Sequence, residues 1–134
     1  MSDLTELLER VKAATGPDRE LDGDVWLAVI SGATRRNVMA AWPDEDVIWE
    51  YHDPERNTMF RDNMIPRLSA SIDAAVAIVE RKMPGWVWQV RKSGYVELHH
   101  PTHHLKDEIG TAKTPPLSIL AALLSALIAQ GASS

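Results

Sequence analysis

Four histidines gather in one short stretch, and their side chains are the most obvious potential metal ligands in the chain. Residues 99–104 read His-His-Pro-Thr-His-His, and Glu97 lies just before them. Neutral imidazoles and a carboxylate are ligands that Zn²⁺ and Ni²⁺ accept. His99 and His100 point to opposite faces if a strand continues through them, so only one of the pair can join the loop histidines. We therefore expect no resident metal or cofactor. His99, His103 and His104 are the candidates if a metal binds, and a solvated loop is the alternative.

The other patterns associated with catalysis are incomplete. Residues 18–23 have the alternating carboxylates and sixth-place glycine of a calcium loop, but Val29 stands where the bidentate glutamate belongs. No serine lies in a Gly-x-Ser-x-Gly elbow, and the sequence has neither a cysteine nor a glycine-rich phosphate loop. We therefore predict a non-enzymatic protein and name no catalytic residue.

Aromatic and basic side chains favour a binding surface instead. Trp42 and Trp49 fall in a stretch without regular periodicity, where a large ring needs either the domain's own surface or a partner to cover it. Arg91 and Tyr95 flank a predicted turn and offer a charge and a stacking ring. These four residues are the interaction candidates. The formal net charge of -5 gives no general attraction to nucleic acid, so a nucleic-acid partner is not expected.

Residues 83–100 predict a β-hairpin around which the rest of the fold is organised. Pro84-Gly85 ends the preceding segment, a run rich in Trp and Val follows, and Ser93-Gly94 supplies the turn before a second strand. The two strands of the hairpin span about residues 86–100. Because side chains alternate along a strand, one face of the hairpin should pack in the core. The residues predicted on that face are Trp86, Trp88, Val90, Val96 and Leu98.

Helical periodicity predicts four helices, over about residues 4–14, 18–30, 70–82 and 117–130, with Ser69 and Thr114 as caps of the last two. The second is ambiguous, because residues 25–30 alone would suit a buried strand. Residues 64–68 are predicted to be an extended lead-in to the sheet, and residues 101–113 a polar loop. Residues 31–63 are predicted to be an irregular insertion, with a strand only near residues 47–51. The whole predicts one α+β domain over residues 1–134, with helices packed on a small antiparallel sheet.

The last predicted helix is apolar around most of its circumference. Residues 117–129 reach only about half the length that a membrane span requires, so we expect a buried helix and no membrane association. One sheet face cannot cover so much apolar surface, which predicts a homo-oligomer. The absence of a leader-like start and of cysteine favours a cytoplasmic location.

Several motifs together resemble the phage ABA sandwich domain family. They are residues 7–11 (Leu-Leu-Glu-Arg-Val), 14–22 (Ala-Thr-Gly-Pro-Asp-Arg-Glu-Leu-Asp), 71–75 (Ser-Ile-Asp-Ala-Ala), 84–88 (Pro-Gly-Trp-Val-Trp) and 114–117 (Thr-Pro-Pro-Leu). The resemblance leaves out about residues 31–63. It implies an α/β/α-type sandwich and a phage or prophage origin within a bacterial host, and it carries no assigned activity.

The function predicted from all this is a small phage or prophage accessory protein of unknown molecular function, acting as a protein-interaction or oligomerisation module. Its partner would be a second copy of the chain, a phage protein or a host protein. The alternative is a protein that acts against host defence by sequestering a small molecule or nucleotide, or by binding nucleic acid, since Trp and Arg side chains near loops can sandwich a base.

Overall fold

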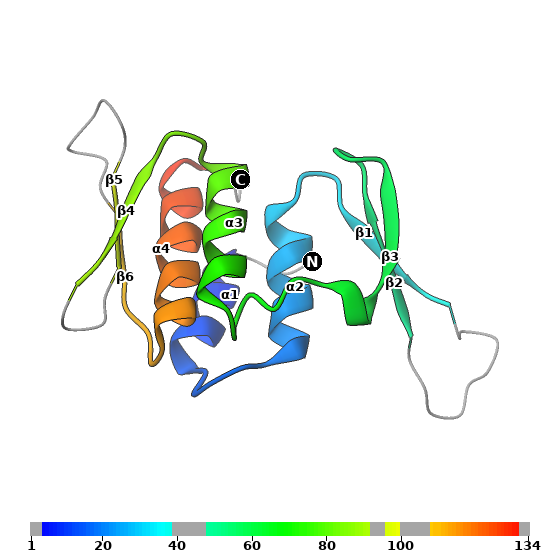
Figure 1. Ribbon diagram of the computed structural model, residues 1–134, viewed down its shortest axis with the longest axis horizontal. Coiled ribbons are helices and arrows are strands. Elements are labelled where there is room, and N and C mark those ends of the chain that lie inside the picture. The colour runs from blue at the N-terminus through cyan, green and yellow to red at the C-terminus, as the bar shows by residue number, and fades with distance from the viewer. Residues whose placement is uncertain (1–3, 39–47, 92–95, 100–107, 132–134) are drawn as a thin grey trace.

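The computed structural model describes residues 4–38, 48–91, 96–99 and 108–131, and within them four α-helices lie between two small antiparallel sheets (Figure 1). The strands are ordered β1-β2-β3 in one sheet and β4-β5-β6 in the other. The elements in chain order are α1 (Leu4–Ala13), α2 (Arg19–Val29), β1 (Thr34–Asn37), β2 (Trp49–Asp53), β3 (Thr58–Arg61), the 3₁₀ turn η1 (Asp62–Met64), α3 (Ile72–Lys82), β4 (Val87–Val90), β5 (Val96–His99), β6 (Glu108–Gly110) and α4 (Pro115–Ala129).

The α+β class predicted from the sequence is confirmed, with helices packed on a sheet. The layer order differs from the α/β/α-type sandwich that the resemblance implies, because here the helices occupy the centre and the sheets lie outside (Figure 1). The reason is that the chain has a second sheet, β1-β2-β3, which covers the side of α2 that faces away from the other helices.

The core is built around α4, which contacts α1, α3, β5 and β6. Thr114 begins the helix as its cap by accepting a hydrogen bond from the Leu117 amide, and two prolines occupy the first turn, where their missing amides cost nothing. Eleven of its fifteen residues are buried. The premise for expecting a homo-oligomer, surplus apolar surface on this helix, is therefore wrong, since elements of the same chain cover it. The oligomeric state itself stays a prediction.

The predicted hairpin is confirmed as the antiparallel pair β4 and β5, in which Trp88 lies opposite Leu98. Val96 and Leu98 are buried against the core, whereas Trp86 and Trp88 are only half-buried. The Ser93-Gly94 turn lies outside the described residues. The third strand of this sheet is β6, which pairs with β5.

Two sequence predictions about the neighbours of this sheet are wrong. Residues 64–68 are not a strand, and residues 108–110 of the predicted polar loop are one. Gly110 explains the second error, because a Cβ atom at this position would lie 2.1 Å from the Ser118 carbonyl oxygen and 2.2 Å from the Ala122 amide nitrogen. β6 thus lies directly on the backbone of α4, and this contact requires a glycine, which has no side chain, at position 110. A strand of three residues is also too short to show an alternating pattern in the sequence.

The stretch predicted to be an irregular insertion is, in its described residues, mostly a three-stranded sheet. Its inner face packs on α2 through aromatic rings: Trp26 makes edge contacts with Tyr51 at 5.7 Å and with Phe60 at 5.2 Å between ring centroids. Gly23 lets the Tyr51 hydroxyl approach α2, since a Cβ atom there would lie 2.4 Å from that oxygen. The prediction of a helix over residues 18–30 is confirmed.

The cap of α3 is Ser71, which accepts from the Ala74 amide, and not Ser69 as predicted. Ser69 makes tertiary hydrogen bonds to Asp18 and Asp22 instead. Its hydroxyl accepts from the Asp18 amide at 2.8 Å and donates to the Asp18 carbonyl at 3.2 Å, and its own amide donates to the buried Asp22 carboxylate at 2.7 Å. These bonds fasten the segment after η1 to the start of α2.

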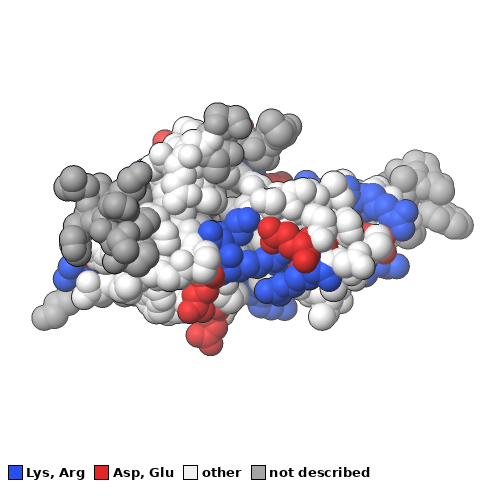
Figure 2. All heavy atoms as spheres, turned by 90° about the horizontal axis from the view of Figure 1, so that it is seen from above, with Lys and Arg blue, Asp and Glu red and all other residues white. Residues whose placement is uncertain are grey.

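The β2–β3 turn is joined to the end of α3 by charged side chains. Arg81 donates to the Asp53 carboxylate at 2.9 Å and to Glu55 at 2.7 Å, and the Arg81 hydrogen bond holds the pKa of Asp53 below its ordinary value. Seen from above, basic and acidic side chains adjoin across the middle of the molecule (Figure 2). No helix in the described part of the chain has both the length and the apolar character needed to cross a membrane.

Candidate functional site

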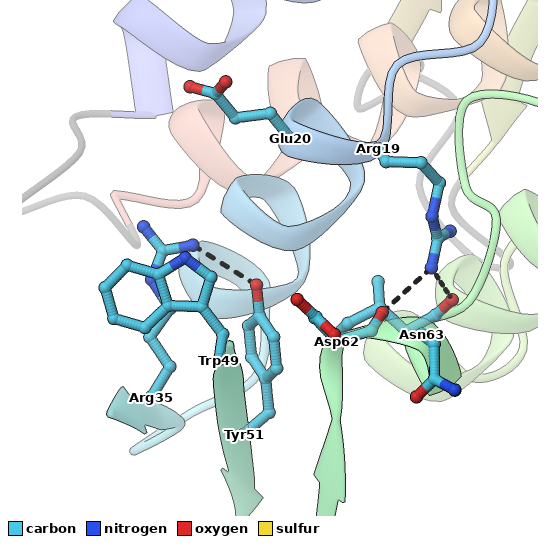
Figure 3. Close-up of a pocket in the computed structure, with 8 residues that line it drawn as sticks. Arg19, Glu20, Arg35, Trp49, Tyr51, Asp62 and Asn63 are labelled. Atoms are coloured by element: carbon cyan, nitrogen blue, oxygen red, sulfur yellow. Dashed lines mark hydrogen bonds between the residues drawn. The ribbon is translucent and has the colours of Figure 1, made fainter. Parts of the chain in front are cut away.

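A hollow of about 470 Å³ opens between the start of α2, the inner face of the β1-β2-β3 sheet and η1 (Figure 3). Its walls combine aromatic rings, two arginines and free polar groups. The lining residues are Arg19, Glu20, Arg35, Trp49, Tyr51, Asp62, Asn63 and Ile65. None of these eight is a cysteine, serine, threonine or histidine, and the ionisable oxygen groups in the lining are those of Glu20, Tyr51 and Asp62.

One wall consists of Arg35, Trp49 and Tyr51, which the pairing of β1 with β2 brings together. The Arg35 guanidinium carbon lies 4.4 Å from the centre of the Trp49 ring, and its Nη1 donates to the Tyr51 hydroxyl at 3.2 Å. Nη2 of the same guanidinium lies 3.3 Å from Asp24 on α2. Stacking and two polar contacts therefore fix the arginine against the tryptophan before any ligand arrives.

The opposite wall is held by Arg19 in the first turn of α2. Its Nη1 donates to the Asp22 carboxylate at 2.9 Å, and its Nη2 donates to the backbone carbonyls of Asp62 at 3.0 Å and Ile65 at 2.9 Å. Arg19 thereby ties both ends of η1 to α2. This arginine is a fixed part of the wall, since bonds within the described residues engage both of its terminal nitrogens.

The carboxylates at the hollow fall into two groups. Asp22 and Asp24 of α2 are paired with arginines. Asp22 pairs with Arg19, and Asp24 pairs with both Arg10 and Arg35. The carboxylates of Glu20 and Asp62 have no ion pair within the described residues. Figure 3 shows the Asp62 side chain directed toward Tyr51, while Glu20 extends away from the ring cluster.

Apolar surface adjoins the hollow on the η1 side. Asn63 and Ile65 both line the hollow, and Met64 between them is 68% exposed. An exposed methionine, whose side chain is unbranched and flexible, is common on surfaces that bind other proteins.

Of the residues singled out in the sequence, Trp49 lies at this hollow. Arg91 directly follows β4 of the other sheet and is paired with Glu97 of β5, and the Nε2 atom of His99 is 3.9 Å from a Glu97 oxygen. Trp42, Tyr95, His103 and His104 fall outside the described residues. Of the candidates that are described, Trp49 belongs to one sheet, and His99 and Arg91 lie in or next to the other. Within the described ranges no group of three or more His, Cys, Asp or Glu side chains is arranged to hold a metal ion.

Sequence reasoning missed most of the hollow. The alternation of Trp49 and Tyr51 along a strand was a usable signal, because two rings two residues apart share one face. Arg35 gave no comparable signal, since its segment reads Thr-Arg-Arg-Asn. The carboxylates at 18 and 22, compared with a calcium loop, instead serve as the α2 cap and as the partner of Arg19.

Comparisons with known proteins leave the site to be interpreted from its own geometry. No protein-family model matches the chain, and neither the curated proteins nor the solved structures include a significant match.

Proposed function

We propose that this protein is a non-enzymatic binding module that holds a segment of a partner protein in the hollow between α2 and the β1-β2-β3 sheet. The observation that carries the proposal is the fixed group of Arg35, Trp49 and Tyr51 on one wall of that hollow. Trp, Tyr and Arg dominate the binding energy of protein interfaces, and side chains already held in place lose little freedom on binding. The exposed Met64 extends this contact surface beyond the hollow.

The alternative, a nucleotide-binding protein, has weaker support. A nucleotide needs free cationic donors for its phosphates. Both arginines of the hollow already donate within the chain, Arg19 to Asp22 and two carbonyls, and Arg35 to Tyr51 beside Asp24. A phosphate would therefore compete with Asp22 and Asp24 for the positive charge of these two side chains. The phage or prophage origin, the accessory role in a bacterial host and the cytoplasmic location stay predictions from the sequence.

A peptide selection tests this proposal. The full chain is used to select binders from a yeast-displayed library of random peptides, and the dissociation constants of selected peptides are measured by calorimetry. Asn63→Trp places a bulky ring at the exposed edge of the hollow, so it should weaken binding at least about tenfold, equivalent to about 1.4 kcal/mol.

Met59→Ala is the matched control, since Met59 is 58% exposed on the outer face of the same sheet. It should leave the dissociation constants unchanged. Selected peptides that bind Asn63→Trp as tightly as the unmodified chain would refute the proposal, provided that both variants keep the melting temperature of the parent.

A further inference from the structure

We propose that the occupant of the hollow is an arginine side chain of a basic partner segment, an inference that rests on the proposed function and specifies its chemistry. The basis is the balance of charge among the side chains at the hollow. Both arginines of the lining already have a carboxylate of α2 as a counter-ion, Arg19 with Asp22 and Arg35 with Asp24.

Acceptors at the hollow remain available. The carboxylate of Asp62 has no side-chain partner among the described residues, and Figure 3 shows it directed toward Tyr51. Asn63 beside it is exposed, and its side-chain amide can accept as well as donate hydrogen bonds. The two carboxylates without a counter-ion therefore favour a ligand that supplies positive charge, whereas the charges of Arg19 and Arg35 are already balanced by Asp22 and Asp24.

The net charge points the same way. Arg10, Arg19 and Arg35 face Asp22 and Asp24 as their partners, and the two unpaired carboxylates of Glu20 and Asp62 leave these seven side chains with a net charge of −1. The chain as a whole carries −5, which attracts basic segments from a distance.

Shape favours arginine over lysine. A guanidinium is planar, so it can lie against the half-buried Trp49 ring and bind both oxygens of Asp62 at once. A lysine ammonium has charge but no flat face, and it gains less from the ring.

A pair of small probes tests the inference on the full chain. N-acetyl-arginine-N-methylamide and the neutral, nearly isosteric N-acetyl-citrulline-N-methylamide are titrated into ¹⁵N-labelled protein, and two-dimensional amide spectra are recorded. The arginine probe should shift the Trp49 indole signal and the amides of Asp62 and Asn63 in a saturable way. The citrulline probe should bind at least about tenfold more weakly, as expected for loss of a charge-assisted bond.

Two variants assign the effect to charge. Asp62→Asn should remove most of the preference for arginine over citrulline, whereas Asp73→Asn, an exposed carboxylate on α3, should leave it unchanged. Glu20→Gln should reduce the preference less than Asp62→Asn, since Glu20 extends away from the rings. Equal binding of both probes, or saturable shifts with inorganic phosphate but not with the arginine probe, would overturn the inference.

Failure here is distinguishable from failure of the proposed function. If the selected peptides bind in the hollow but need no arginine, the proposed function stands and only the inference about an arginine side chain is refuted. If the selected peptides bind the Asn63→Trp variant as tightly as the parent, the hollow is not the binding site and the proposed function is refuted as well.

Discussion

The two sheets of this protein are attached to the helices in different ways. The β4-β5-β6 sheet lies on α4 with fully buried aliphatic side chains, Val96 and Leu98, and with backbone against backbone at Gly110. The β1-β2-β3 sheet meets α2 through aromatic rings and charged groups, including Trp26 against Tyr51 and Arg35 beside Asp24.

The contrast separates stability from recognition. Buried aliphatic side chains and close backbone contact, as at Val96, Leu98 and Gly110, chiefly stabilise the fold. The polar contact leaves a hollow with unpaired carboxylates at its edge, and this is where a ligand can gain interactions that the free protein lacks. We therefore expect the folding energy to come chiefly from the α4 side, and the proposed function places binding on the α2 side.

The largest expected effect is on the α4 side. Gly110→Ala places a methyl group 2.1 Å from the Ser118 carbonyl oxygen and 2.2 Å from the Ala122 amide nitrogen, and neither backbone atom can move without displacing the helix. We expect the free energy of unfolding to fall by about 3 kcal/mol or more, the upper end of overpacking costs. Urea denaturation followed by circular dichroism measures it.

Gly16→Ala is the matched control, since a Cβ atom there meets nothing within 4 Å. It should change the free energy of unfolding by less than about 0.5 kcal/mol. Similar losses for both variants would contradict the close contact between β6 and α4.

A smaller effect is expected where α2 meets β2. Gly23→Ala brings a methyl group 2.4 Å from the Tyr51 hydroxyl, and the ring cannot withdraw because it is 3% exposed and stacked on Phe60. The clash should exceed the gain of about 1 kcal/mol from replacing a helical glycine, leaving a net loss of about 1 to 2 kcal/mol.

Removing the hydroxyl should reverse the sign. In the Tyr51→Phe background, Gly23→Ala should be neutral or stabilising, because the nearest remaining ring atom, Cζ, lies 3.4 Å away. The double-mutant cycle of unfolding free energies measures this coupling. Additive effects of the two substitutions would contradict the contact.

The smallest expected effect depends on pH. Arg81 holds the pKa of Asp53 below its ordinary value of 3.8, so the folded carboxylate contributes stability that is complete above that value and is lost as pH falls through the lower, folded pKa. Asp53→Asn should therefore cost about 1 to 2 kcal/mol near neutral pH and progressively less below about pH 4.

Unfolding curves at several pH values, with Glu9→Gln as an exposed control on α1, measure this difference. A stability gap between Asp53→Asn and the parent that stays constant down to about pH 2 would contradict the ion pair as its source.

Helices could be predicted from the sequence because their signals are local. Apolar residues at helical spacing, and caps such as Thr114, lie within one turn of the element they define. The choice of Ser71 over Ser69 as the α3 cap could not be predicted, because Ser69 is drawn to Asp18 and Asp22, about fifty residues earlier.

The β1-β2-β3 sheet and its hollow were largely beyond local reasoning. β1 consists of Thr-Arg-Arg-Asn, which has no apolar alternation, and β6 has only three residues. The hollow itself joins residues from 19 to 65, whose neighbourhood exists only through strand pairing and the contacts of Arg19 with η1. Only Trp49, a large ring without an obvious cover, marked the region in advance.

The central claim, that recognition belongs to the α2 side, is tested most directly by mapping a selected peptide on the full chain by amide and indole NMR shifts. We predict that the largest shifts fall on Trp49, Tyr51, Asp62 and Asn63, which line the hollow, while Val96 and Leu98 of β5 stay unchanged. Shifts concentrated on β4 and β5, with the hollow unaffected, would contradict the account.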